Sequence, residues 1–216
     1  MFPTSLPAST KHHGQPNVSR NALLLSGGMD SIALAYGLRP DLCITIDYGQ
    51  RAAEGEIRAS SAICAALNLK HRLLKVDCSE VGSGDMSSRP AIDIAPVPEW
   101  WPFRNQLLIT FAAAVDIQEG ISSVSIGSVV TDGAHADGRP EFFRGMRELI
   151  RQQEGSIVLD TPAIDKTTVE LCRLVQIPFT LLAWAHSCHV APYACGKCRG
   201  CCKHRDCMKE LGYDIY

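Results

Sequence analysis

The sequence lacks long hydrophobic runs, and no stretch approaches the roughly 18 consecutive apolar residues that a membrane span requires. It also lacks a long basic run, since 21 Lys and Arg residues are balanced by 23 Asp and Glu residues for a formal charge of −2. Nucleic-acid binding is dominated by neutralisation of the phosphate backbone, so this balance argues against a nucleic acid as a direct partner. Membrane association is not expected either.

The first twenty residues are rich in proline, serine and other polar residues, and they contain no continuous apolar core of the kind found in signal peptides. We expect residues 1–20 to form a disordered arm and the protein to be cytoplasmic. The chain of 216 residues is 46% hydrophobic, which is enough to bury one sizeable core. We therefore expect one α/β domain over residues 21–183 and a small C-terminal segment over residues 184–216.

Short apolar runs alternate with amphipathic stretches along the chain, and these two patterns predict buried strands and helices, respectively. Such alternation predicts an α/β fold with a mostly parallel sheet and helices on both faces, in which ligands bind beyond the carboxyl ends of the strands. The weakly patterned segment 79–98 is either a mobile flap over the site or an insertion. The predicted strands cover residues 22–25, 42–48, 71–77, 123–128 and 156–160, and the predicted helices cover 30–38, 54–67, 103–118, 140–153 and 166–175.

Ten cysteines are distributed unevenly along the chain. Four lie in its body, mostly inside apolar stretches where a buried thiol is the ordinary interpretation, namely Cys43, Cys64, Cys78 and Cys172. The other six fall close together near the C-terminus, namely Cys188, Cys195, Cys198, Cys201, Cys202 and Cys207. Without a secretion signal, such crowding indicates metal ligation rather than disulfides.

The C-terminal cysteines include the spacing C-x6-C-x2-C-x2-C, formed by Cys188, Cys195, Cys198 and Cys201. Two chained C-x-x-C units and a fourth cysteine upstream can close a tetrahedron around one ion, and Zn²⁺ is the commonest occupant of such a site. A structural zinc that fixes the C-terminal segment to the domain is the favoured interpretation. An Fe–S cluster and a redox or persulfide-carrying thiol pair are the alternatives. Cys202 and Cys207 have no evident place in the tetrahedron, and His204 is a candidate substitute ligand.

A glycine-rich turn joins the first predicted strand to the first predicted helix, within the sequence NALLLSGGMDSIALAYGL. Gly27 and Gly28 permit positive φ angles and bring backbone N–H groups close to an anion. The N-terminus of the following helix carries a partial positive charge, and Ser26 and Ser31 add hydroxyl donors. The alternative is a plain tight turn with a capping side chain, but the combination favours a phosphate site.

The lysine of the common ATP-binding loop G-x-x-x-x-G-K-[ST] is missing here. The turn instead resembles the SGGxDS loop of the N-type ATP pyrophosphatase (PP-loop) superfamily, whose fold is of the adenine nucleotide alpha hydrolase type. This resemblance implies that the loop holds the β- and γ-phosphates of ATP while a nucleophile attacks the α-phosphorus and pyrophosphate leaves. It also implies Mg²⁺, with Asp30 holding the ion or orienting the loop. The implied ATP-binding residues are Ser26, Gly27, Gly28, Met29, Asp30 and Ser31, with Asp47, Gly49 and Gln50 after the second strand.

Several stretches together point to one family within this superfamily. In chain order they are LLLSGGMDS, DYGQR followed by Glu56, PFRNQLLITFAA, DGRPEF, DTPAIDKTTV and HSCH…ACGKCRGCCKHR. Together they resemble the 7-cyano-7-deazaguanine synthase (QueC) family over residues 21–213. The resemblance implies that ATP adenylates the carboxylate of 7-carboxy-7-deazaguanine and that ammonia converts the acyl adenylate to an amide. A second ATP then activates the amide oxygen, and loss of AMP leaves the nitrile. Adenylation is chemically sensible because AMP is a far better leaving group than hydroxide.

The same resemblance implies roles for further residues. Arg104 and Asn105 match the family's Arg-Asn pair, expected at the rim of the active site. Asp137 and Arg139 match its Y-P-D-C-R motif, which implies a deazaguanine pocket, and Lys166 matches a lysine that could contact phosphate or the adenylate. A solvated surface charge is the alternative for Arg104 and Lys166. The implied catalytic residues are Asp30, Arg104 and Lys166, and the implied substrate-binding residues are Asn105, Asp132, Asp137 and Arg139.

The chain departs from the family pattern near the presumed acceptor pocket. The family's Y-P-D-C-R motif is replaced by His135-Ala136-Asp137-Gly138-Arg139, and its usual histidine after D-Y-G-Q-R is Ala52. A second hypothesis is therefore a QueC-like paralogue that passes the activated carboxylate to an amine of a protein or nucleic acid, as family-like members in antiphage defence operons suggest. A tRNA sulfur-transfer protein or a non-catalytic zinc module is a third, disfavoured because no basic RNA-binding domain is visible. The family resemblance also implies a homodimer.

Overall fold

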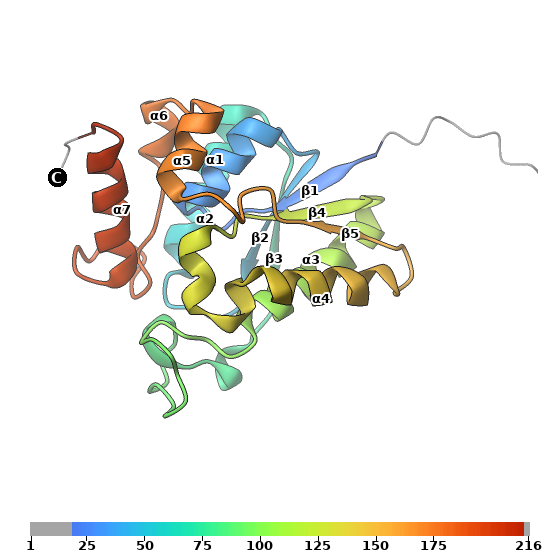
Figure 1. The fold of residues 1–216 in the computed structure, drawn as a ribbon, viewed down its shortest axis with the longest axis horizontal. Coiled ribbons are helices and arrows are strands. Elements are labelled where there is room, and N and C mark those ends of the chain that lie inside the picture. The colour runs from blue at the N-terminus through green and yellow to red at the C-terminus, as the bar shows by residue number, and fades with distance from the viewer. Residues whose placement is uncertain (1–18, 214–216) are drawn as a thin grey trace, which may run out of the picture.

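Five short parallel strands form one sheet at the centre of the protein (Figure 1). The computed structural model describes residues 19–213, so the predicted N-terminal arm lies almost entirely outside the described residues. The strand order is β3-β2-β1-β4-β5. The strands are β1 (Asn21–Leu24), β2 (Leu42–Asp47), β3 (His71–Lys75), β4 (Ser123–Ile126) and β5 (Val158–Asp160). The predicted α/β fold with a parallel sheet is confirmed.

Helices cover both faces of this sheet (Figure 1). On one face lie α3 (Arg104–Glu119) and α4 (Pro140–Arg151). The other face carries α1 (Met29–Leu38), α2 (Ala53–Leu67), α5 (Thr168–Val175) and α6 (Phe179–Leu182), followed by α7 (Arg199–Glu210). In the part of the chain that the structure describes, no helix is long and apolar enough to cross a membrane.

Each face of the sheet has its own apolar layer. Ile109 of α3 and Phe143 of α4 pack on one face, and both are almost completely buried. Ile32 of α1, Ile63 of α2 and Met208 of α7 pack on the other. Because the strands are covered on both sides, they are short continuous apolar runs rather than alternating ones. The C-terminal helix therefore takes part in the core of the α/β domain through Met208.

The order of the strands creates a crevice between β1 and β4. The chain runs outward from β1 through β2 to β3, and it then returns to the opposite side of β1 at β4. The loops that follow β1 and β4 consequently leave the sheet in different directions, which is where open α/β sheets bind ligands. The glycine-rich turn follows β1, and Asp132 follows β4.

The segment between β3 and α3 is irregular apart from two short 3-10 turns, Ser79–Val81 and Gly84–Met86. Near its end Trp101 is only 2% exposed, and its ring meets that of Tyr48 edge to face with centroids 4.9 Å apart. The buried side chain of Met86 also joins the core. Apolar anchors at two places therefore attach this segment to the loop after β2.

Candidate active site

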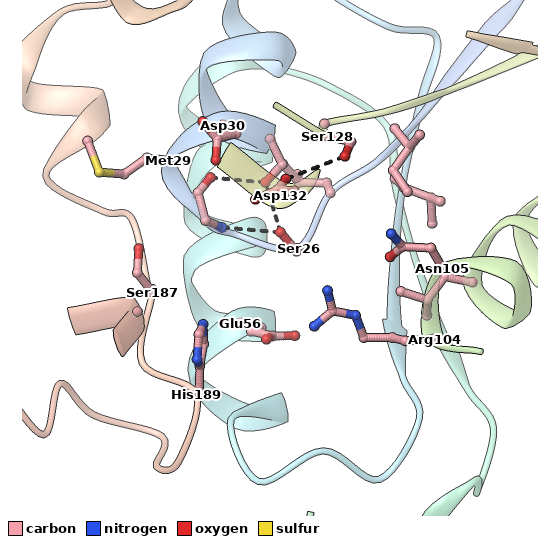
Figure 2. Close-up of a pocket in the computed structure, with 18 of the residues that line it drawn as sticks. Ser26, Met29, Asp30, Glu56, Arg104, Asn105, Ser128, Asp132, Ser187 and His189 are labelled. Carbon is pink, nitrogen blue, oxygen red and sulfur yellow. Dashed lines mark hydrogen bonds between the residues drawn. The ribbon is translucent and has the colours of Figure 1, made fainter. Parts of the chain in front are cut away.

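A cavity of about 270 Å³ opens at the carboxyl end of the sheet, in the crevice between β1 and β4 (Figure 2). Several separate parts of the chain line it, among them the turn after β1, the start of α2, the start of α3, the loop after β4 and the C-terminal segment. Segments far apart in the sequence thus meet around one space. The apolar part of its lining comes mainly from Leu24, Ile44, Ile46, Met86 and Leu108.

The turn after β1 has the geometry of an anion site. Gly27 has a φ of +77°, and a Cβ there would lie 2.8 Å from the carbonyl oxygen of Glu56, so a larger residue is excluded. Gly28 precedes the first turn of α1, whose first N–H groups lack intrahelical partners, and residues 28–31 line the cavity. The Ser26 and Ser31 hydroxyl groups lie 3.2 Å apart beside these N–H groups. The turn can therefore hold an anion through backbone N–H groups and hydroxyls.

The C-terminal segment packs directly against this turn. The backbone N–H of His186 donates a 2.8 Å hydrogen bond to the carbonyl oxygen of Gly27. Two further glycines make the approach possible, because a Cβ on Gly55 would lie 2.5 Å from the His186 ring and one on Gly200 would lie 1.9 Å from the carbonyl oxygen of Ser187. The far end of the chain thus forms one wall of the cavity.

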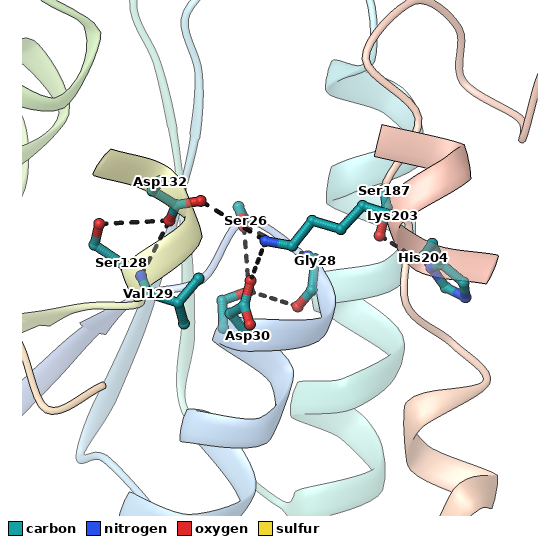
Figure 3. A network of polar contacts seen from close by, with 10 residues as sticks. Ser26, Gly28, Asp30, Ser128, Val129, Asp132, Ser187, Lys203 and His204 are labelled. Atoms are coloured by element: carbon teal, nitrogen blue, oxygen red, sulfur yellow. Dashed lines mark hydrogen bonds and ion pairs between the residues drawn. The ribbon is translucent and has the colours of Figure 1, made fainter. Parts of the chain in front are cut away.

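Two carboxylates and one ammonium group meet beside the turn (Figure 3). Lys203 Nζ lies 3.5 Å from Asp30 Oδ2 and 3.7 Å from Asp132 Oδ1. The other oxygen of Asp132 accepts hydrogen bonds from the Val129 N–H and the Ser128 hydroxyl at 3.1 and 3.4 Å, which fixes its orientation. Burial raises the pKa of Asp30, although the Lys203 ammonium opposes the shift. Asp30 Oδ1 is buried without a hydrogen-bond partner among the described residues.

Arg104 and Glu56 face each other across the opposite part of the cavity (Figure 2). Gln50 Nε2 donates a 2.8 Å hydrogen bond to Glu56 Oε2 and holds this carboxyl in place. Burial raises the pKa of Glu56 to about 7, while the Gln50 hydrogen bond and the Arg104 charge oppose the shift. Glu56 therefore changes charge near neutral pH, next to the guanidinium group.

The structure brings together most of the residues that the sequence assigned to ATP and catalysis. Gly27 lies in the same turn, behind the surface that faces the cavity. The predicted site residues that line the cavity are Ser26, Gly28, Met29, Asp30, Ser31, Arg104, Asn105 and Asp132.

Other predicted residues lie outside the lining of this cavity. Asp137 accepts a 3.0 Å hydrogen bond from the Asn105 N–H, so its carboxylate caps the start of α3. Arg139 Nε donates to the carbonyl oxygen of Gly133 at 3.0 Å, and Lys166 Nζ pairs with Asp165 at 2.9 Å. The remaining three, Asp47, Gly49 and Gln50, shape the loop after β2. Their contacts with ligands stay predictions.

Several lining residues had no role in the sequence analysis, among them Thr168, His186, Ser187, His189 and Lys203. Four of them come from the C-terminal segment, where the cysteine spacing was the dominant signal. Lys203 follows Cys201 by two positions, but nothing in that spacing indicates contact with Asp30, 173 residues earlier in the chain. Glu56 was noted only as part of a matching stretch.

The four predicted cysteine ligands converge on one point. Their sulfur atoms all lie within 4.8 Å of one another, with 3.9 Å between Cys195 and Cys201 and between Cys188 and Cys198. Backbone N–H groups of Lys197 and Cys198 lower the pKa of the Cys195 thiol, which favours the thiolate that a metal requires. His204 lies outside this group, with its Nδ1 3.0 Å from the Ser187 hydroxyl. The cluster can bind a metal ion.

Comparison with known proteins assigns the chain to a family. The family model described as "Queuosine biosynthesis protein QueC" matches residues 20–212. The chain belongs to the QueC family. It is 30% identical to the 7-cyano-7-deazaguanine synthase of Thermoplasma volcanium over 213 residues, which cover 88% of this chain and 87% of the relative. It is 33% identical to the corresponding enzyme of Acidobacterium capsulatum over 210 residues, which cover 86% and 90% of the two chains.

Among solved structures, the fold is similar to that of the U34-tRNA thiolase NcsA from Methanococcus maripaludis, a structure that contains a [4Fe–4S] cluster. The TM-score is 0.52 at 18% identity, and the match covers 90% of this chain and 66% of the thiolase chain. At this identity the similarity concerns the fold. It supports the α/β fold, whereas the QueC assignment comes from the sequence matches.

Replacing Cys198 by serine should remove the metal and destabilise the protein. The change deletes one of four thiolates, and a metal bound only by the folded state adds its binding free energy to folding. We expect the wild type to contain about one equivalent of metal and the variant almost none, with a melting temperature lower by about 10 °C. Elemental analysis and thermal unfolding measure both.

The control is Cys202→Ser, which changes a neighbouring cysteine outside the group of four. It should retain the metal and the melting temperature of the wild type. Metal-free wild-type protein, purified without chelators, would contradict the assignment, and so would equal metal contents in the two variants.

Proposed function

We propose that this protein is an ATP-dependent ligase that adenylates the carboxylate of 7-carboxy-7-deazaguanine. The carboxylate oxygen attacks the α-phosphorus of ATP, pyrophosphate leaves, and ammonia displaces AMP to form the amide. A second ATP activates the amide oxygen in the same way, and loss of AMP with two protons leaves the nitrile. Membership of the QueC family supports this reaction, because the relatives are 7-cyano-7-deazaguanine synthases.

One observation of the structure carries the proposal. The anion-binding turn, the acidic pair and Arg104 all line the same cavity, although they come from the start of α1, the start of α3 and the segment after β4. The turn offers N–H groups for the phosphates that leave, and the apolar walls suit a flat heterocycle. A nucleotide and a second ring system can thus approach each other inside one space.

The donor set fits a divalent cation that accompanies ATP. Asp30 and Asp132 supply carboxylate oxygens beside the turn, and Asp30 Oδ1 is a buried oxygen without a partner among the described residues. Oxygen ligands of this kind suit Mg²⁺. When bound, Mg²⁺ would neutralise negative charge on the phosphates. The protein's own part is to hold the pyrophosphate on the N–H groups of the turn.

Arg104 is the proposed partner of the substrate carboxylate. Its guanidinium group faces the cavity and can align a carboxylate by two parallel hydrogen bonds. Asn105 lies next to it at the start of α3, where Asp137 fixes the backbone. Contact of Lys166 with the nucleotide, and of Asp137 and Arg139 with the substrate, remain further parts of the proposal.

Zinc is the proposed metal of the four-cysteine cluster. A Zn–S distance of about 2.3 Å in a tetrahedron places the sulfurs about 3.8 Å apart. The two sulfur pairs at 3.9 Å lie close to that value, which supports one mononuclear ion. In a four-iron cluster each thiolate binds a different iron atom, so the cysteine sulfur atoms must lie farther apart than around a single ion. A cytoplasmic location, expected from the composition of the chain, and a homodimer, implied by the family resemblance, are also proposed.

The activity is tested by incubating the protein with 7-carboxy-7-deazaguanine, ATP, Mg²⁺ and ammonium. We expect substrate-dependent AMP and pyrophosphate, and the nitrile by mass spectrometry. The Arg104→Met variant should be slower by roughly 100-fold, since a charged contact to the reacting group is lost. Arg144→Met, on the exposed side of α4, is the matched control. Absence of substrate-dependent AMP from the wild type would contradict the proposal.

The altered loop after β4 favours a second candidate for the last step. Gly138 replaces the family's cysteine, and a Cβ at this position would lie 2.3 Å from the carbonyl oxygen of Asp132. The family residue therefore does not fit here without a shift of the loop. A different acceptor, such as a protein amine, is consistent with this change. AMP release without nitrile, together with a deazaguanine adduct on an added protein, would identify this activity.

Glu56 should make substrate binding depend on pH near neutrality. With its pKa raised to about 7, Glu56 is mainly neutral at pH 6 and mainly charged at pH 8. The charged form competes with the substrate carboxylate for Arg104, so KM for 7-carboxy-7-deazaguanine should rise several-fold from pH 6 to 8. Glu56→Gln should remove most of this rise, whereas Glu54→Gln on the exposed side of α2 should not. The same pH profile in all three proteins would show that Glu56 is not responsible.

A further inference from the structure

The phosphate turn lacks a lysine in its own sequence, yet a lysine lies beside it in the folded protein. Among the described residues that line the cavity, the lysine and arginine side chains are Lys203 and Arg104. Arg104 lies in the part of the cavity that faces Glu56, whereas Lys203 lies against the turn (Figures 2 and 3). The two positive charges therefore lie in different parts of the cavity, and each can contact a different part of a ligand.

We propose that Lys203 is the phosphate-binding cation of this active site, supplied by the metal-binding C-terminal segment in place of the lysine that the turn lacks. The inference rests on the proposed use of ATP. Its ligand class is a polyphosphate, either ATP or the pyrophosphate that leaves. The distances of 3.5 Å to Asp30 and 3.7 Å to Asp132 place the ammonium group between the two carboxylates that flank the turn.

The position of Lys203 is set by the cysteine cluster. Cys198 caps the first turn of α7, where its sulfur accepts a 3.4 Å hydrogen bond from the Cys201 N–H. Lys203 comes two residues after Cys201 in the same helix. The next residue, His204, has its Nδ1 3.0 Å from the Ser187 hydroxyl. A metal that fixes Cys198 and Cys201 therefore also fixes the direction in which Lys203 leaves the helix.

The charges around Lys203 suit an exchange of partners. The side chain is 38% exposed and reaches a surface that also carries Ser26 and Gly28 of the turn. Two carboxylates and one ammonium group leave a net negative charge, which would repel a polyphosphate. If a divalent cation binds the carboxylates of Asp30 and Asp132, the Lys203 ammonium group can contact phosphate oxygens at the same place. Lys203 can thus neutralise the acids first and the phosphates afterwards.

Pyrophosphate binding tests the inference without the deazaguanine substrate. Titration calorimetry with pyrophosphate and Mg²⁺ would compare wild type, Lys203→Met, Lys203→Arg and the control Lys209→Met, an exposed lysine on the same helix. We expect Lys203→Met to bind pyrophosphate and ATP at least tenfold more weakly, with a smaller salt dependence. Lys203→Arg should recover part of the affinity, Lys209→Met should match the wild type, and adenosine, which carries no phosphate, should bind all four equally.

Metal content and melting temperature would be measured on each variant, so that a loss of folding is separated from a loss of charge. If Lys203→Met does not fold, Lys203→Gln and the comparison of Lys203→Arg with wild type take its place. Wild-type pyrophosphate affinity in a folded, metal-loaded Lys203→Met protein would overturn the inference and leave only a structural ion pair. Lys203-dependent polyphosphate binding without any deazaguanine-dependent AMP would instead contradict the proposed substrate and leave the inference intact.

Discussion

The backbone hydrogen bond from His186 to Gly27 joins the last part of the chain to the first loop, and the geometry of the cavity depends on it. Both partners are closely packed, since a Cβ on Gly27 would meet the Glu56 carbonyl oxygen of α2 and a Cβ on Gly55 would meet the His186 ring. The four-cysteine cluster begins two residues after His186, at Cys188. A metal in that cluster would therefore do more than stabilise a terminal segment, since it would also support the loop that we propose to hold pyrophosphate.

The electrostatics of the cavity follow from the same arrangement. Acidic groups lie at both ends of it, and each has a basic side chain nearby: Lys203 beside Asp30 and Asp132, and Arg104 opposite Glu56. In the absence of ligands, a nearby positive charge lowers the free-energy cost of burying a carboxylate. They also offer positive charges to anionic substrates once the carboxylates are protonated or bound to a cation. One end thus suits the phosphates of the proposed ATP, and the other suits the carboxylate of the proposed substrate.

Local patterns predicted the fold and the position of the Gly-Gly turn between β1 and α1, because strands, helices and tight turns depend on neighbouring residues. The cysteine spacing likewise predicted a cluster that the folded chain assembles. The contact of Lys203 with Asp30 could not be predicted, since it joins positions 173 residues apart and depends on how α7 packs. The raised pKa of Glu56 arises from burial, which the sequence does not display. The sequence likewise gave no sign that the Asp137 carboxylate accepts a hydrogen bond from the backbone at the start of α3, and its contact with substrate stays a prediction.

We infer that a metal bound in the C-terminal segment holds the phosphate turn in its binding geometry. Hydrogen exchange of the wild-type protein, before and after removal of the metal by a chelator, tests it most directly. After metal removal, amides of residues 26–31 should exchange faster together with those of residues 184–204, while β3 at the edge of the sheet should keep its protection. Faster exchange confined to residues 184–204, with an unchanged turn, would contradict it.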